Sequence, residues 1–268
     1  MFYGDGVGLV LVLHQKSIAD KVFVESCVVK LDSINAVTKK FGLRCLNTCS
    51  VDNLMARFFI VEKNTPEPMG VLAFRGTAHF KNWITNLNTA TTNWSDTALV
   101  HQGFLKGFEK LWPLCETAVK DTPPNLYYVG HSLGAAFATL AAATRPPKAL
   151  YTLGSPRVGN QDFCQLITST VPSYRIVQHC DIVPTLPWEN PLSPFTHLGQ
   201  YHYFNHLGEH LVDPQNADVF ADQFKRNLDW SEILNPHALG KPIKALSDHS
   251  PINYTYALEQ ELGSQVFQ

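Results

Sequence analysis

One serine in the chain stands in a pattern that supports nucleophilic chemistry. Ser132 lies within Gly130-His131-Ser132-Leu133-Gly134, after a short apolar run with two aromatic residues and before an alanine-rich stretch. The apolar run predicts a buried strand and the alanine-rich stretch a helix, so the serine falls at a sharp turn between them. Small residues are needed where the entering and leaving chains pass closely. Such a nucleophile elbow presents a hydroxyl for attack on a carbonyl carbon, which is acyl-transfer chemistry.

A serine hydroxyl is a weak nucleophile at neutral pH and needs a histidine base that is oriented by an acid. In the α/β-hydrolase fold, which uses this elbow, the acid follows the serine in the chain and the histidine comes last. Asp181 directly follows a strand-like apolar run and is the predicted acid. The rival acids fit other roles, because Asp162 begins a helix, Asp213 precedes a proline in a turn and Glu189 lies in a proline-rich loop.

Several histidines follow the predicted acid and are candidates for the base. They are His197, His202, His206, His210, His237 and His249. His249 lies in a loop that leads into an apolar helix near the C-terminus, so its position and its order in the chain favour it, with His237 as the second choice. The base takes the serine proton and returns it to the leaving alcohol, while the acid fixes the imidazole tautomer.

The tetrahedral oxyanion needs hydrogen-bond donors that are already in place. One predicted donor is the backbone N–H of Leu133, the residue after the nucleophile, and the other comes from the loop after an early strand. Thr77 follows Arg75-Gly76 in that loop and offers both its N–H and its hydroxyl. Thr77 also suits the N-cap of the next helix, and the two roles are compatible because a helix N-terminus favours an anion.

The remaining elements alternate between strands and helices. Strands are predicted at 57–63, 69–74, 126–129, 148–153, 174–179 and 200–205. Helices are predicted at 16–40, 80–87, 103–119, 161–171 and 249–262, and a further helix is predicted to begin at 133. This alternation implies an α/β fold with a mostly parallel central sheet flanked by helices. We find no repeat or linker and expect a single domain over residues 1–268.

The composition is that of a globular protein and excludes some functions. The 268 residues are 45% hydrophobic and 16% charged, with a formal net charge of −2 and no basic patch, so no nucleic-acid partner is expected. No apolar run reaches the length of a transmembrane segment. The apolar run at 9–13 lacks a basic region before it and is not interpreted as a signal peptide, which leaves secreted and cytoplasmic locations open. The six cysteines are expected to be mostly buried free thiols, and we expect no metal site and no cofactor.

A set of motifs resembles one known family over roughly residues 57–256. The motifs are FRGT at 74–77, NWITNL at 82–87, VHQGF at 100–104, GHSLGAA at 130–136, GSPRVGN at 154–160 and DIVPTLP at 181–187. In this order they resemble the class 3 lipases, the family of filamentous-fungal triacylglycerol lipases, whose relatives include phospholipases A1 and feruloyl esterases. The resemblance implies a Ser132, Asp181 and His249 triad, and Thr77 with Leu133 as oxyanion donors.

The resemblance also assigns non-catalytic roles and marks departures. It implies that Arg75 and Arg157 are structural ion-pair residues, and it makes His197 and His202 non-catalytic. The fungal enzymes are secreted and disulfide-bonded, commonly with a cysteine near the C-terminus, whereas no cysteine follows Cys180 here.

The resemblance further implies an amphipathic lid helix at 78–90 over the site. Its apolar stripe is Phe80, Trp83, Ile84 and Leu87, and an ordinary helix packed on the core would show the same stripe. An acyl groove is expected from the hydrophobic residues that flank the acid, which are Val183, Leu186, Trp188 and Phe195. The expected partner is a lipid or another ester; triglyceride, phospholipid and phenolic ester are not separated by the sequence.

Two other functions fit parts of the sequence. Residues 206–210 read H-x-x-E-H, an inverted zinc-hydrolase motif that requires a helix, and the glycine inside it disfavours one. A non-catalytic binding module on a hydrolase fold is the second, because a fold does not fix a function. The complete set of serine, acid, histidine and oxyanion candidates favours an enzyme over both.

Overall fold

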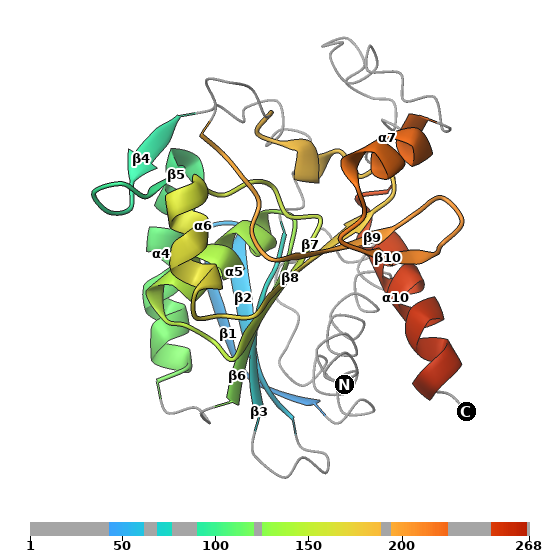
Figure 1. Ribbon diagram of the computed structural model, residues 1–268. Coiled ribbons are helices and arrows are strands. Elements are labelled where there is room, and N and C mark those ends of the chain that lie inside the picture. Colours follow the sequence, from blue (N-terminus) through green and yellow to red (C-terminus); the bar gives the residue numbers. More distant parts are fainter. Residues whose placement is uncertain are drawn as a thin grey trace.

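A computed structural model describes residues 43–61, 69–76, 90–120, 125–188, 194–224 and 248–266 of the chain (Figure 1). The predicted lid at 78–90, the helices expected at 16–40, Thr77 and His237 lie outside the described residues. The four lid residues Phe80, Trp83, Ile84 and Leu87 therefore stay a prediction.

The centre of the fold is an eight-stranded sheet in the order β1-β2-β3-β6-β7-β8-β9-β10 (Figure 1). The five strands from β3 to β9 in this order pair in parallel, and the end strands β1, β2 and β10 pair antiparallel. The strands are β1 (Leu43–Val51), β2 (Leu54–Val61), β3 (Met69–Phe74), β6 (Asn125–His131), β7 (Ala149–Leu153), β8 (Ser173–Gln178), β9 (Gln200–Phe204) and β10 (His210–Val212). The mostly parallel sheet predicted from the sequence is therefore present.

Helices cover both faces of this sheet (Figure 1). On one face lie α4 (Gln102–Ala118), α5 (Leu133–Thr144) and α6 (Gln161–Thr168), and on the other lies α10 (Pro251–Val266). α7 (Asn216–Phe224) follows the β9–β10 hairpin, and a separate small sheet pairs β4 (Thr91–Asn93) with β5 (Leu99–His101). None of the described helices is long and apolar enough to cross a membrane.

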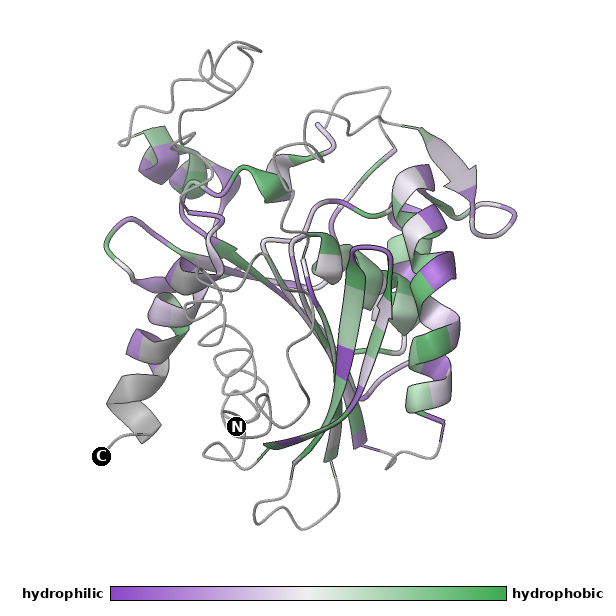
Figure 2. Ribbon diagram, turned by 180° about the vertical axis from the view of Figure 1, so that it is seen from behind, coloured by the Kyte–Doolittle hydropathy of each residue, from purple (hydrophilic) through white to green (hydrophobic). Residues whose placement is uncertain are grey.

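The alternation of side chains along the strands builds one core on each face of the sheet. On β6, Leu126 and Tyr128 belong to the core under α4 and α5, whereas Val129 belongs to the core under α10. Figure 2 shows the sheet from behind, with hydrophobic residues concentrated along the central strands. Since α5 lies against the sheet, nearly all its residues are buried, and its alanines allow this close approach.

Most predicted elements are present with shifted bounds. The hairpin of the early strands, the helix at 103–119 and the strand at 200–205 correspond to the β2–β3 pair, α4 and β9. β1, the two strands of the small sheet, β10 and α7 were not predicted from the sequence. It also treated the proline-rich stretch after Asp181 as irregular throughout, whereas Val183–Thr185 form a short 3₁₀ turn.

Candidate active site

Ser132 occupies a strained turn between the end of β6 and the beginning of α5. Its backbone angles are φ 60° and ψ −128°, outside both the strand and the helix regions. For a residue with a side chain such a conformation costs about 1–3 kcal/mol and is held by the surrounding structure. The Ser132 N–H donates to the Leu153 carbonyl at the end of β7, at 3.0 Å. The nucleophile elbow predicted from the sequence is therefore formed.

The two glycines of the elbow are required by backbone packing. A Cβ at Gly130 would lie 2.2 Å from the Gly134 carbonyl oxygen, and a Cβ at Gly134 would lie 2.2 Å from the Phe74 carbonyl oxygen. Both distances are far below van der Waals contact. The second contact also fixes the elbow helix against the end of β3, from which the chain continues to Arg75 and Gly76.

Asp181 and His249, the predicted acid and base, form a hydrogen-bonded pair in the structure. Asp181 follows β8 through a tight turn, and His249 precedes α10. The Nδ1 atom of His249 lies 2.9 Å from Oδ1 and 2.8 Å from Oδ2 of Asp181. Both residues are buried. An Nδ1–H that donates to the carboxylate leaves Nε2 as the basic nitrogen, which is the tautomer that a general base requires.

Two further donors hold the Asp181 carboxylate in place. The Val183 N–H donates to Oδ1 at 2.9 Å, and the Tyr254 hydroxyl donates to Oδ2 at 2.6 Å. Burial and the neighbouring carboxylate hold the pKa of Tyr254 well above its usual value, so the phenol keeps its proton. The Tyr254 oxygen in turn accepts the Gln178 N–H at 3.1 Å, which ties α10 to the end of β8.

His131, the residue before the nucleophile, supports the base. Its ring stacks on the His249 ring with centroids 4.6 Å apart, and its Nε2 lies 3.0 Å from the His249 carbonyl oxygen. That distance suits an Nε2–H donor. His131 therefore links the serine turn to the backbone of His249, the predicted base.

Gly154 provides the space in which the acid and the base meet. Its φ is +53°, and a Cβ there would lie 2.6 Å from Asp181 Oδ2 and 3.0 Å from His249 Nδ1. The end of β7 therefore passes directly against the Asp181–His249 pair, and Ser132 is hydrogen-bonded to that same strand end. Ser132 Oγ is buried and makes no hydrogen bond with a described residue.

One side of the predicted oxyanion hole lies next to the serine. A Cβ at Gly76 would lie 3.2 Å from Ser132 Cβ and 2.9 Å from the His131 carbonyl oxygen, so the chain that leads to Thr77 passes against the elbow. Leu133 is the first residue of α5, where backbone N–H groups have no acceptor within the helix. The backbone donors predicted at Leu133 and Thr77 stay predictions, and Thr77 lies outside the described residues.

The predicted acyl-groove residues differ in exposure. Val183, Leu186 and Phe195 are buried, whereas Trp188 is 42% exposed. The N–H of Val183 anchors the Asp181 carboxylate, and the Leu186 carbonyl accepts the Arg157 N–H at 2.8 Å. The Arg157 guanidinium donates to the carbonyls of Thr185 and Pro187. These contacts support the loop after the acid, and a role in acyl binding stays a prediction.

Several rival residues have other partners in the structure. His197 Nε2 donates to the Pro184 carbonyl, and the ring of His202 contacts His210 and Gln200. Residues 206–210 connect β9 to β10 in a turn with Gly208 at φ +80°, and not in a helix. His206 contacts Asp222 and His210 contacts His202, so the two histidines of the H-x-x-E-H motif face different partners.

The sequence analysis missed three residues of this site: His131, Gly154 and Tyr254. His131 stands inside the elbow motif and Gly154 opens the GSPRVGN motif, but neither pattern reveals a contact with His249. Tyr254 follows His249 by five residues, so a helix beginning behind the base was the available signal. The described cysteines, in contrast, are all buried free thiols, as expected.

Known sequences share the segment that carries the serine and the acid. The family model for class 3 lipases matches residues 71–190. A secreted mono- and diacylglycerol lipase of Fusarium solani is 41% identical over 129 residues, which are 44% of this chain and 39% of the relative. A secreted mono- and diacylglycerol lipase of Penicillium cyclopium is 36% identical over 173 residues, 58% of this chain and 52% of the relative. The chain thus spans about half or less of the length of these relatives.

Solved structures share the fold over a larger part of the chain. The triacylglyceride lipase of Rhizomucor miehei superimposes with a TM-score of 0.62 at 22% identity, covering 91% of this chain and 92% of that one. A lipase of Rhizopus microsporus superimposes with a TM-score of 0.54 at 26% identity, covering 73% and 71%. The α/β-hydrolase fold predicted from the elbow is therefore confirmed. The segment at 71–190 that the class 3 lipase model matches contains both Ser132 and Asp181.

Proposed function

We propose that the protein is a serine carboxylic-ester hydrolase that acts on acylglycerols through Ser132, His249 and Asp181. The observation that carries the proposal is that a strained serine turn after β6 and a buried Asp181–His249 hydrogen bond both lie against the end of β7, the strand between β6 and β8. Structural cores do not need a serine at φ 60° or a histidine held to a carboxylate through Nδ1. Acyl transfer by a serine triad on an α/β-hydrolase fold uses the two together.

In the proposed reaction, Ser132 Oγ attacks the ester carbonyl carbon while His249 Nε2 takes the hydroxyl proton. The tetrahedral oxyanion is stabilised by the N–H groups of Leu133 and Thr77. The carbon–oxygen bond to the alcohol then breaks, and the alcohol leaves with the proton from His249. Water then attacks the acyl-enzyme carbonyl carbon while His249 takes its proton. The bond between the acyl carbon and Ser132 Oγ breaks, His249 returns the proton to Oγ, and the carboxylic acid is released. Among the described residues Ser132 Oγ has no hydrogen-bond partner, and catalytic hydrogen bonds of this kind often form only when substrate is bound.

The acylglycerol assignment rests on the relatives, whose names state mono- and diacylglycerol or triacylglyceride substrates. Phospholipids, through phospholipase A1 activity, and feruloyl or other carboxylic esters are the second candidates, because the triad chemistry is the same for each. The predicted lid at 78–90 would make activity rise as a short-chain ester passes its solubility limit.

A fluorophosphonate probe followed by a substrate panel tests the proposal. The probe should label the native chain at Ser132 and fail to label Ser132→Ala, with mass spectrometry locating the adduct. The same preparation is then assayed with a diacylglycerol, a phosphatidylcholine and a feruloyl ester. Hydrolysis of the diacylglycerol as the preferred substrate supports the proposal. Folded protein that neither reacts with the probe nor hydrolyses any of the three esters would leave the non-catalytic binding module as the better reading.

A further inference from the structure

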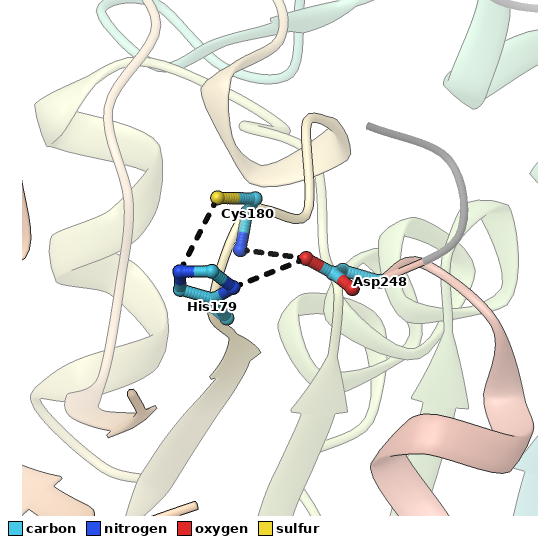
Figure 3. A group of neighbouring side chains, drawn as sticks. All are labelled: His179, Cys180 and Asp248. Carbon is cyan, nitrogen blue, oxygen red and sulfur yellow. Dashed lines mark hydrogen bonds and ion pairs between the residues drawn. The ribbon is translucent and has the colours of Figure 1, made fainter. Parts of the chain in front are cut away.

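A second cluster of ionisable side chains lies directly behind the Asp181–His249 pair. It consists of His179, Cys180 and Asp248, all buried (Figure 3). Cys180 is the chain neighbour of the catalytic acid, and Asp248 is the chain neighbour of the base. The cluster is therefore built from the same two loops that hold the catalytic pair, but its side chains contact one another.

The imidazole of His179 lies between the other two groups, as Figure 3 shows. Its Nδ1 is 3.3 Å from Asp248 Oδ2, and its Nε2 is 3.4 Å from Cys180 Sγ. The Cys180 N–H also donates to Asp248 Oδ2 at 3.2 Å. His179 has φ +28°, an unusual conformation for a residue with a side chain, so the local backbone is held against its own preference to bring these groups together.

We propose that His179 Nδ1, Cys180 Sγ and Asp248 Oδ2 form a binding site for a divalent transition-metal ion of the zinc type, separate from the catalytic triad. One nitrogen, one sulfur and one carboxylate oxygen are ligands that Zn²⁺ takes at about 2.0–2.3 Å, which places two ligands of a tetrahedral ion roughly 3.3–3.8 Å apart. The Nδ1–Oδ2 distance of 3.3 Å already has this value, and one possible ligand atom from each of the three residues lies within 4.8 Å of the others. Cys180 Sγ lies at the Nε2 edge of the ring, 3.4 Å from that nitrogen, so metal binding through Nδ1 requires the Cys180 side chain to rotate towards it. A water molecule would take the fourth position.

The surroundings match a metal-bound histidine. Asp222 Oδ2 lies 3.6 Å from His179 Nε2, and a small closer approach would let it accept the N–H of a ring that binds metal through Nδ1. Carboxylates commonly orient metal-bound histidines in this way. Asp222 is itself held by the Tyr203 hydroxyl at 2.6 Å and by His206. The His206 side chain is 33% exposed and marks the side on which this cluster reaches solvent.

Charge balance is compatible with a divalent ion at these three ligands. A neutral imidazole, a thiolate and a carboxylate together carry two negative charges, which a divalent ion neutralises. Metal binding would release the protons that the ligands hold, and no buried charge would then be left without compensation.

The test is a titration of the chelator-treated full chain with Co²⁺, which reports thiolate ligation by a charge-transfer absorption band in the near ultraviolet. We expect one Co²⁺ per chain with this band, and its displacement by Zn²⁺. Cys180→Ala should abolish the band, while Cys164→Ala, which removes an equally buried thiol on α6, should retain it. Asp222→Asn should keep the band and weaken binding about 10- to 100-fold, as expected for a partner of a ligating histidine.

A second readout guards against variants that fail to fold. Zn²⁺ should raise the Tm of the native chain and of Cys164→Ala, because the ion joins the two loops, and should leave the Tm of Cys180→Ala and His179→Gln unchanged. His210→Ala removes a histidine of the β9–β10 hairpin and should behave like the native chain. The proposal is overturned if the native chain binds Co²⁺ without a thiolate band, if it binds none, or if Cys180→Ala keeps the band. These outcomes do not depend on ester hydrolysis.

Discussion

The hydroxyl of Tyr254 donates to the carboxylate of Asp181 at 2.6 Å, so the proposed catalytic acid is held by the helix that begins directly after His249, the proposed base. We expect Tyr254→Phe to lower kcat about tenfold with a smaller effect on KM. The carboxylate loses a charge-assisted donor, worth about 1.5–3 kcal/mol, and then orients His249 less firmly. Steady-state kinetics and urea denaturation of the purified variant measure both effects.

Tyr256→Phe is the matched control for this prediction. It also removes a tyrosine hydroxyl from α10, but at a position that is 63% exposed. Its kcat and its free energy of unfolding should equal those of the native chain. A Tyr254→Phe variant with native kcat would show that the hydrogen bond to Asp181 has no part in positioning the acid.

Alanine substitutions at two glycines can separate the effect of backbone strain from the effect of contact with the Asp181–His249 pair. Gly154→Ala places a methyl group 2.6 Å from Asp181 Oδ2 at a φ of +53°, so we expect it to destabilise the fold and to lower kcat by at least about tenfold. Gly208→Ala imposes a similar strain at φ +80° in open space, costing about 1–2 kcal/mol, and should keep the native kcat. Equal kcat values for the two variants would mean that the space at Gly154 is not needed for catalysis.

The triad assignment predicts a particular pattern of activity loss. Ser132→Ala and His249→Ala should each lower kcat by about 10⁴-fold or more, and the double variant should be little worse, because residues that act as a unit are not additive. His237→Ala should retain activity. Circular dichroism of each variant checks the fold. An inactive His237→Ala beside an active His249→Ala would transfer the role of base to His237.

Acid should destabilise the protein through buried neutral histidines. Burial, and then the charge of neighbouring His210, lower the pKa of His202 to about 4. Because its folded pKa lies below the unfolded value of about 6.5, the native state binds fewer protons than the unfolded chain. The stability from neutral His202 is therefore fully present above about pH 6.5 and is lost as the pH falls through about 4.

Urea denaturation between pH 4 and pH 7.5 measures this dependence. His202→Gln should show a shallower loss of the free energy of unfolding than the native chain. Asp52→Asn, which removes the exposed ion pair with Lys110, should follow the native slope, since exposed pairs contribute little. An unchanged slope in His202→Gln would assign the acid sensitivity to other groups, such as His197, whose pKa burial lowers well below its usual value.

The sequence predicted those parts of the fold and site that local patterns determine. The elbow, the strand before Asp181 and the helix after His249 each follow from apolar runs with the expected period, and the chain order then assigned the pair that the structure brings together. β1 was missed because LRCLNTCSV interleaves polar residues irregularly, and a bulge near Cys45 breaks its alternation. The roles of His131, Tyr254 and Gly154 arise from contacts between distant segments, so no local pattern carries them.

The attachment of α10 has a consequence for how activity is lost under stress. The serine lies at a junction where β3, β6 and α5 meet through backbone contacts. His249, the proposed base, instead precedes α10, which packs on the sheet through the side chains of Tyr254, Ala257 and Leu258. Elements held by a small number of buried side chains open locally at lower free energy than central strands. Amide protons of α10 should therefore exchange faster than those of β6, and inactivation in denaturant should precede the loss of the sheet.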